Sequence, residues 1–248
     1  MKNVINVSDI QLTNGGYYTG EALDNGYGMI EISGKGKVRN PDGSSYDGSW
    51  KYGRPYGYGI YRFADGDFHK GYFDDTPNGV GYLCLNTTNQ MRLGFFSNGK
   101  LNGWMMSIGQ GRFSFGWAEN GRIVKEHSKE SQWMQNFLQF TVFRKYKGNM
   151  IQISKEEYGY IRYGAPSRDN KIGINYPPIG FTFFNDGKVV IGELVDINIL
   201  NGNLVVCYPD HKIVSGRWKD NKLFRELSIE DVDAGIYMSY KTREMFDD

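Results

Sequence analysis

The sequence predicts an all-β fold: an elongated antiparallel solenoid of β-hairpins with a short helical insertion and a C-terminal capping helix. Three observations carry this prediction: a composition rich in glycine and aromatics, landmark glycines spaced about 23 residues apart, and Asp-Gly or Asn-Gly pairs between the expected strands. Glycine accounts for 33 of the 248 residues, about 13%, against a usual share of about 7%. Aromatic residues supply a further 15%. With so many aromatics and only 7 prolines, the chain is not expected to be disordered.

The repeat is clearest in the glycines that begin successive units. These lead glycines are Gly48, Gly71, Gly94 and Gly116, spaced by 23, 23 and 22 residues. The turn positions 43, 66, 89 and 111 keep the same steps. Several landmarks that share one period indicate a structural repeat. A single hairpin cannot bury its apolar face alone, whereas stacked hairpins can, which explains why the unit recurs.

Each unit is expected to form one hairpin. In the clearest unit, the first strand carries Tyr46-Asp47-Gly48-Ser49-Trp50 and the second follows a Gly-x-Gly as 59–63. Asp65-Gly66 and equivalent pairs favour tight type I′ turns, because both residues accept positive φ. Asn98-Gly99 and its equivalents can turn the other end of the hairpin. The lead glycine has no Cβ, so we expect a ring from the next strand to lie across it.

This unit resembles the MORN (membrane occupation and recognition nexus) repeat, with its Tyr-x-Gly-x-Trp head, Gly-x-Gly middle and late turn glycine. Residues 46–50, Gly57-Tyr58-Gly59 and Gly66 fit the pattern closely, and the resemblance is good over about 44–121. The following two units replace the tryptophan by Phe73 and Phe96. The resemblance implies a scaffold that binds another protein, or a membrane surface, without turnover.

A second, degenerate array is predicted downstream. Gly164, Gly180, Gly187 and Gly192 match Gly20, Gly36, Gly43 and Gly48 at a constant offset of 144 residues. Valines stand at its tyrosine positions, which leaves open whether it keeps a binding surface. We therefore predict a first array over 1–125, a helical and hairpin insertion over 126–155, a second array over 156–227, and a helical cap or tail over 228–248.

The insertion and the C-terminal segment carry the helix predictions. Trp133, Phe137 and Phe140 have helical spacing, and Ser228 is suited to cap a helix start. The back face of the first array changes along the chain from polar residues, such as Asp47, to apolar residues, such as Leu93 and Phe115. We expect Trp133, Met134 and Phe137 to cover this apolar part, and the alternative covers are a partner or a second copy.

The sequence offers no recognisable catalytic or cofactor motif. The three histidines are far apart, Cys84 and Cys207 have no neighbouring histidine, and the Gly-x-Gly pairs do not precede a helix. The carboxylates are explained by turns or by solvated surface positions. We therefore expect no cofactor, no metal and no enzymatic activity, although a pair of acids that cleaves a glycosidic bond remains an alternative.

The aromatic face of the first array is the candidate partner-binding site. Rings that line a groove could hold an extended segment or a helix of a protein partner, whereas rings packed on one another would be the core. The candidate residues for partner contact are Tyr46, Trp50, Tyr61, Phe63, His69, Phe73, Arg92 and Phe96. Both interpretations stay open at this point.

Charge and hydropathy restrict the partners. The net charge is +1 with interspersed signs, which argues against nucleic acid and gives a peripheral membrane contact little support. We expect a cytoplasmic protein, because no signal-peptide core or membrane-length apolar run occurs. A homodimer through the array ends or the apolar back face is a further expectation. Rival functions are a carbohydrate-binding or carbohydrate-acting β-protein and a regulatory, immunity-type inhibitor of a neighbouring enzyme.

Overall fold

The computed structural model describes residues 3–109, 112–127, 151–153, 160–164, 179–193, 199–229 and 231–232. Within these ranges the chain is all-β, with antiparallel strands that pair with their neighbours in sequence. No helix of the described residues is long and apolar enough to cross a membrane.

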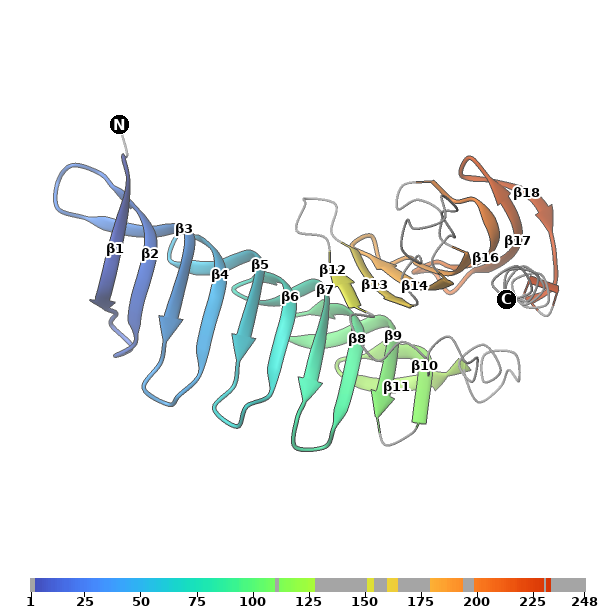
Figure 1. Cartoon of the computed structure of the whole chain (residues 1–248), viewed down its shortest axis with the longest axis horizontal. Coiled ribbons are helices and arrows are strands. Elements are labelled where there is room, and N and C mark those ends of the chain that lie inside the picture. The colour runs from blue at the N-terminus through green and yellow to red at the C-terminus, as the bar shows by residue number, and fades with distance from the viewer. Residues whose placement is uncertain are drawn as a thin grey trace, which may run out of the picture. The chain divides into compact units, whose positions relative to one another are not determined.

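The described strands form two sheets, each with its strands in sequence order (Figure 1). The first sheet contains β1 (Asn3–Gln11), β2 (Tyr17–Asp24), β3 (Ile30–Arg39), β4 (Ser45–Lys51), β5 (Arg54–Arg62), β6 (Phe68–Asp74), β7 (Thr76–Leu85), β8 (Gln90–Ser97), β9 (Lys100–Gly109), β10 (Arg112–Glu119) and β11 (Arg122–Glu126). The second sheet contains β12 (Ile151–Ile153), β13 (Tyr160–Gly164), β14 (Ile179–Phe184), β15 (Val189–Glu193), β16 (Gly202–Cys207), β17 (Ile213–Lys219) and β18 (Lys222–Glu226).

The chain divides into two compact units, and the division falls inside β10. One unit holds Met1–Arg112 and Ala118–Ile123, and the other holds Phe113–Trp117 and Val124–Asp248. The four segments expected from the sequence, with their boundaries, stay predictions.

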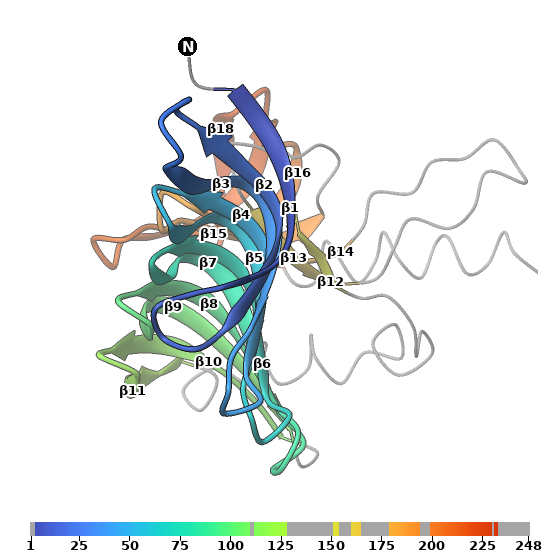
Figure 2. The same cartoon turned by 90° about the vertical axis from the view of Figure 1, so that its left-hand side faces the viewer.

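Glycines meet in register along the first sheet. Each glycine of this row is the pairing partner of the next on the neighbouring strand. In order, the glycine row is Gly20, Gly36, Gly48, Gly59, Gly71, Gly81 and Gly94. The spacing that marked these residues in the sequence therefore reflects one line of contact across seven strands. The strands of the first sheet are strongly curved (Figure 2).

The second sheet repeats this register at the predicted offset. Gly164 pairs with Gly180, and Gly180 pairs with Gly192, as their counterparts do in the first sheet. The row then continues through Leu204 to Gly216. Six valine, leucine or isoleucine side chains of β15 and β16 are buried around it, so aliphatic side chains make up much of the core here.

The turns differ from the prediction at the Asp-Gly pairs. Asp42 and Asp65 do not have positive φ, so neither pair forms a type I′ turn. Each pair instead ends a three-residue loop in which the glycine alone is left-handed, with φ of 89° at both Gly43 and Gly66. The aspartate Oδ1 accepts a hydrogen bond from the N–H two residues on, 2.9 Å at Ser44 and 3.0 Å at Asp67. This local bond holds the aspartate in the right-handed part of the loop.

Type I′ geometry occurs at the opposite end of the hairpins. Both central residues have positive φ at Asn98-Gly99 and Asn120-Gly121, which the sequence marked as turns. Tyr52-Gly53 has the same geometry, with φ of 52° and 75°, although a tyrosine gives no hint of it. The first glycine of the Gly-x-Gly motif lies where the strand pairing shifts beside the lead glycine. At these shifts Gly57 and Gly79 have φ of 75° and 106°.

The described residues include only the start of the predicted C-terminal helix. The N–H of Asp231 donates to Ser228 Oγ at 3.1 Å, and the N–H of Val232 donates to the Ser228 carbonyl at 3.0 Å. These bonds form one capped helical turn. A capping helix beyond this turn, and the insertion helix with Trp133, Phe137 and Phe140, lie outside the described residues and stay predictions.

Candidate binding surface

Most of the aromatic residues picked from the sequence form one continuous row of stacked rings. We call Tyr18, Trp50, Tyr46, Phe73, His69 and Phe96 the ring row. Its neighbouring rings meet edge to face, with centroids 4.5–5.3 Å apart. Every member is at least 93% buried. Each ring therefore contacts rings of the adjacent hairpin, which is the geometry that aromatic pairs prefer.

The glycine row makes room for these rings. Tyr46 lies across Gly59 on the next strand, where a Cβ would come within 2.6 Å of the Tyr46 ring. The ring therefore comes from the head of the same hairpin and covers the second glycine, whereas the sequence predicted a ring from the next strand over the lead glycine. The Tyr46 hydroxyl donates to the Ser49 carbonyl at 2.9 Å, and Trp50 Nε1 donates to the Gly36 carbonyl at 2.9 Å.

The candidate site residues thus divide into two groups. Tyr46, Trp50, His69, Phe73 and Phe96 are buried in the ring row, so the packed-core interpretation describes them and they offer no free groove. Tyr61, Phe63 and Arg92 are at least partly accessible. The Tyr61 hydroxyl donates to Ser44 Oγ at 3.1 Å, and its ring meets that of Phe63 edge to face. Partner contact through these three residues stays a prediction.

The back face shows the predicted change from polar to apolar. Asp47 on β4 is exposed, whereas Leu93 on β8 and Phe115 on β10 are buried. The ring of Phe115 lies 5.6 Å from that of Phe181 on β14. The expected cover of Trp133, Met134 and Phe137 lies outside the described residues, so that hypothesis remains untested. Phe181 is a contact that the sequence analysis did not foresee.

Burial keeps the histidine of the ring row and the two cysteine thiols uncharged. Burial lowers the pKa of His69 to about 3, which leaves the imidazole uncharged at neutral pH. Burial also raises the pKa of the Cys84 thiol, and that of Cys207 to about 12, which suppresses thiolate chemistry. In the described ranges, no group of three or more His, Cys, Asp or Glu side chains gathers as metal ligands.

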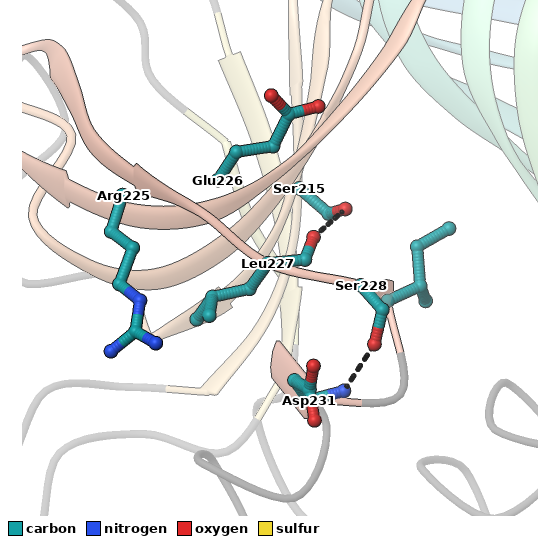
Figure 3. Close-up of a pocket in the computed structure, with 7 residues that line it drawn as sticks. Ser215, Arg225, Glu226, Leu227, Ser228 and Asp231 are labelled. Carbon is teal, nitrogen blue, oxygen red and sulfur yellow. Dashed lines mark hydrogen bonds between the residues drawn. The ribbon is translucent and has the colours of Figure 1, made fainter.

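A cavity in the second unit has no converging reactive groups. Its volume is about 650 Å³, and its lining is Ser215, Arg225, Glu226, Leu227, Ser228, Ile229 and Asp231. The Ser215 hydroxyl donates to the Leu227 carbonyl at 2.7 Å, so it holds the chain that leaves β18. Arg225 and Glu226 point to opposite sides of that strand (Figure 3). This arrangement serves local structure more than ligand binding.

Exposed apolar side chains gather instead at one end of the first hairpins. We call Tyr27, Met29, Ile30, Tyr52 and Tyr56 the tip surface. All five are exposed, Tyr27 by 90% and Tyr52 by 69%. The β2–β3 loop that carries Tyr27 and Met29 extends from the N-terminal end of the sheet (Figure 1). The Gly53 N–H, in the β4–β5 turn, donates to the Ile32 carbonyl at 2.9 Å, which fixes that turn beside β3.

A lysine contacts two of the three tyrosines of the tip surface. Lys51 Nζ lies 4.8 Å from the ring centroid of Tyr56 and 5.4 Å from that of Tyr52. One ammonium over two rings restricts both side chains through cation–π attraction. Rigid, exposed aromatic rings beside a cation give large contact area at a low entropic cost.

Tyr52 is an unfavourable choice for its own turn. In the equivalent turns this left-handed position holds Asn98, Asn120 and Asp220, residue types that tolerate positive φ. A tyrosine there costs about 1 kcal/mol or more of stability. The sequence analysis missed Tyr52, and the available signal was a bulky aromatic residue where the equivalent turns have Asn or Asp. Backbone strain that places an exposed ring points to a functional position.

Comparison with protein-family models finds no match, and comparison with curated proteins finds no similar sequence. The resemblance to MORN repeats therefore rests on the residues and spacing given above.

Proposed function

We propose that this chain is a MORN-like, non-catalytic repeat scaffold of stacked β-hairpins, and that it binds a protein partner through the tip surface. The observation that carries the proposal is Tyr52, an exposed ring held in a left-handed turn at a cost to folding. The glycine row supports the scaffold part, because the repeating landmarks build one frame. The tip surface replaces the ring row as the binding surface, since the ring row is occupied by its own packing.

The chemistry of the tip surface favours a protein over a small ligand. Its five members are tyrosine, methionine and isoleucine, which suit the buried centre of a protein interface. They stand on a loop, a turn and the adjoining strand ends, whereas small molecules are usually enclosed in a concave pocket. The adjoining Lys51 and Arg54 would favour carboxylates at the rim of the partner.

The variant Tyr52→Asn separates binding from folding. We expect it to raise the free energy of unfolding by about 0.5–1 kcal/mol, because asparagine accepts the left-handed turn, while the cation–π contact is lost. We also expect it to weaken partner binding, measured by quantitative cross-linking and mass spectrometry in native lysate. A protein captured by the wild type should be lost with Tyr52→Asn and retained with Phe224→Asn.

Phe224 is a matched control, because its ring is 74% exposed and lies in the other unit. Equal capture by the wild type and Tyr52→Asn would reject the tip surface as the binding site. Binding of a glycan array by the wild type, with no protein captured, would reject protein binding and favour the carbohydrate alternative.

A further inference from the structure

Strand β1 is the outer edge of the first sheet. It pairs with β2 on one side, and within the described part of the chain no strand pairs with its other side. Alternate residues of an edge strand direct their N–H and C=O groups outward, where another strand can pair with them. Proteins usually block such an edge with charges, proline or a bulge.

Three of the four described edge strands, β1, β11 and β18, have five residues or more and differ in that protection; the fourth, β12, has only three residues. β11 has three charged residues among five, Arg122, Lys125 and Glu126, and β18 also has three charged residues among five. The six residues Asn3–Ser8 of β1 contain neither a charge nor a proline. The irregular pairing of β1, which includes Asp9 with φ of 51°, begins after Val7. The regularly paired residues Asn3, Val4, Ile5, Asn6 and Val7 therefore form an unprotected edge.

The apolar side of this edge continues the core of the first sheet. Val7 packs against the buried cluster that includes Tyr18, Val38 and Tyr46, yet it is only partly buried itself. Ile5 lies two residues earlier on the same side of the strand and is also only partly buried. An added strand would cover the free sides of both residues and extend the core past β1.

We propose that the occupant of this edge is the β1 strand of a second copy of the chain, paired antiparallel about a two-fold axis close to Ile5 and Asn6. Such an axis stands normal to the sheet, so Ile5 and Val7 of both copies lie on the same face. A residue at the axis faces its own counterpart, which makes an uncharged segment self-compatible. The first sheets of the two copies then form one continuous sheet.

The test introduces a charge at the axis. Asn6 is exposed, so Asn6→Lys and Asn6→Glu should leave the monomer folded, which circular dichroism checks. The mass is measured by sedimentation over a range of concentrations, with 28.3 kDa as the monomer value. We expect the wild type to dimerise, each variant alone to dissociate at least about tenfold more readily, and an equimolar mixture of the two variants to recover the dimer.

Val124→Lys provides the matched control, because Val124 is 56% exposed on the other edge of the same sheet. It should dimerise as the wild type does. A monomeric wild type, a dimer that survives Asn6→Lys, a dimer that is lost with Val124→Lys, or a mixture that stays monomeric would each overturn self-pairing of β1. None of these variants touches the tip surface, so the outcome is independent of partner binding.

Discussion

His69 makes the first unit sensitive to acid, and this sensitivity can be removed by one substitution. His69 occupies the position of Tyr18 and Tyr46 in the ring row, where those hydroxyls donate to the backbone carbonyls of Glu21 and Ser49. The shorter imidazole leaves Nε2 buried without a hydrogen-bond partner among the described residues. The folded state therefore strongly favours the neutral ring.

The direction and size of the change in stability with pH follow from two pKa values of His69, one in the unfolded and one in the folded state. In the unfolded chain histidine titrates near 6.5, whereas burial lowers the pKa of His69 in the folded state to about 3. Between these values the unfolded state binds one more proton, so stability falls as the pH falls, by about 1.4 kcal/mol per pH unit. Acidification from pH 7 to 5 should then cost about 2 kcal/mol through this residue.

The perturbation is His69→Tyr, with His69→Phe as a second variant that removes the titrating group without adding a hydroxyl. The assay is urea unfolding at pH 5, 6 and 7, followed by tryptophan fluorescence. We expect both variants to lose about 2 kcal/mol of the pH dependence. His69→Tyr should also be more stable than the wild type at pH 7 by about 1–2 kcal/mol, because the buried orphan nitrogen is gone and the hydroxyl can reach a carbonyl. An unchanged pH dependence in both variants would refute the reasoning.

Two further predictions concern the glycines of the first sheet and the buried tryptophans. Gly59→Ala should cost about 3 kcal/mol of unfolding free energy, since its Cβ would come within 2.6 Å of the head ring; Gly26→Ala, which meets open space at φ of 77°, should cost about 1 kcal/mol. Trp50→Phe should cost about 1–2 kcal/mol in the same urea assay, because it loses the bond to Gly36. Trp218→Phe should cost less, because its buried Nε1 has no acceptor in the described residues; equal losses would contradict this account.

The sequence was most informative where one residue type performs one geometric task. A spacing that recurs at several glycines can arise only if those positions are equivalent in space, and the register confirms this from Gly20 to Gly94. The antiparallel hairpin order followed from the same spacing. The type I′ prediction at Asp42-Gly43 was wrong. A dipeptide does not reveal the length of its loop, nor the hydrogen bond that the Asp42 carboxylate accepts from the Ser44 N–H.

The candidate site was harder to predict for a physical reason. Alternation places a ring on a face, but it does not show whether that face is open or filled by the rings themselves. The burial of Tyr46 and Trp50 depends on how the rings of neighbouring hairpins meet, which no local pattern encodes. Tyr52 was missed because its left-handed conformation depends on the strands on either side of it.

The ring row also bears on how this protein can change in length. Since each ring touches only those of the hairpins next to it, stability accumulates as a sum of nearest-neighbour terms. Duplicating residues 45–67 would insert one more hairpin with both of its required neighbours already present, and would lengthen the array by about 10 Å. Growth and shortening in whole modules are therefore open to this architecture, whereas an insertion of a few residues within a strand would shift every ring beyond it out of register.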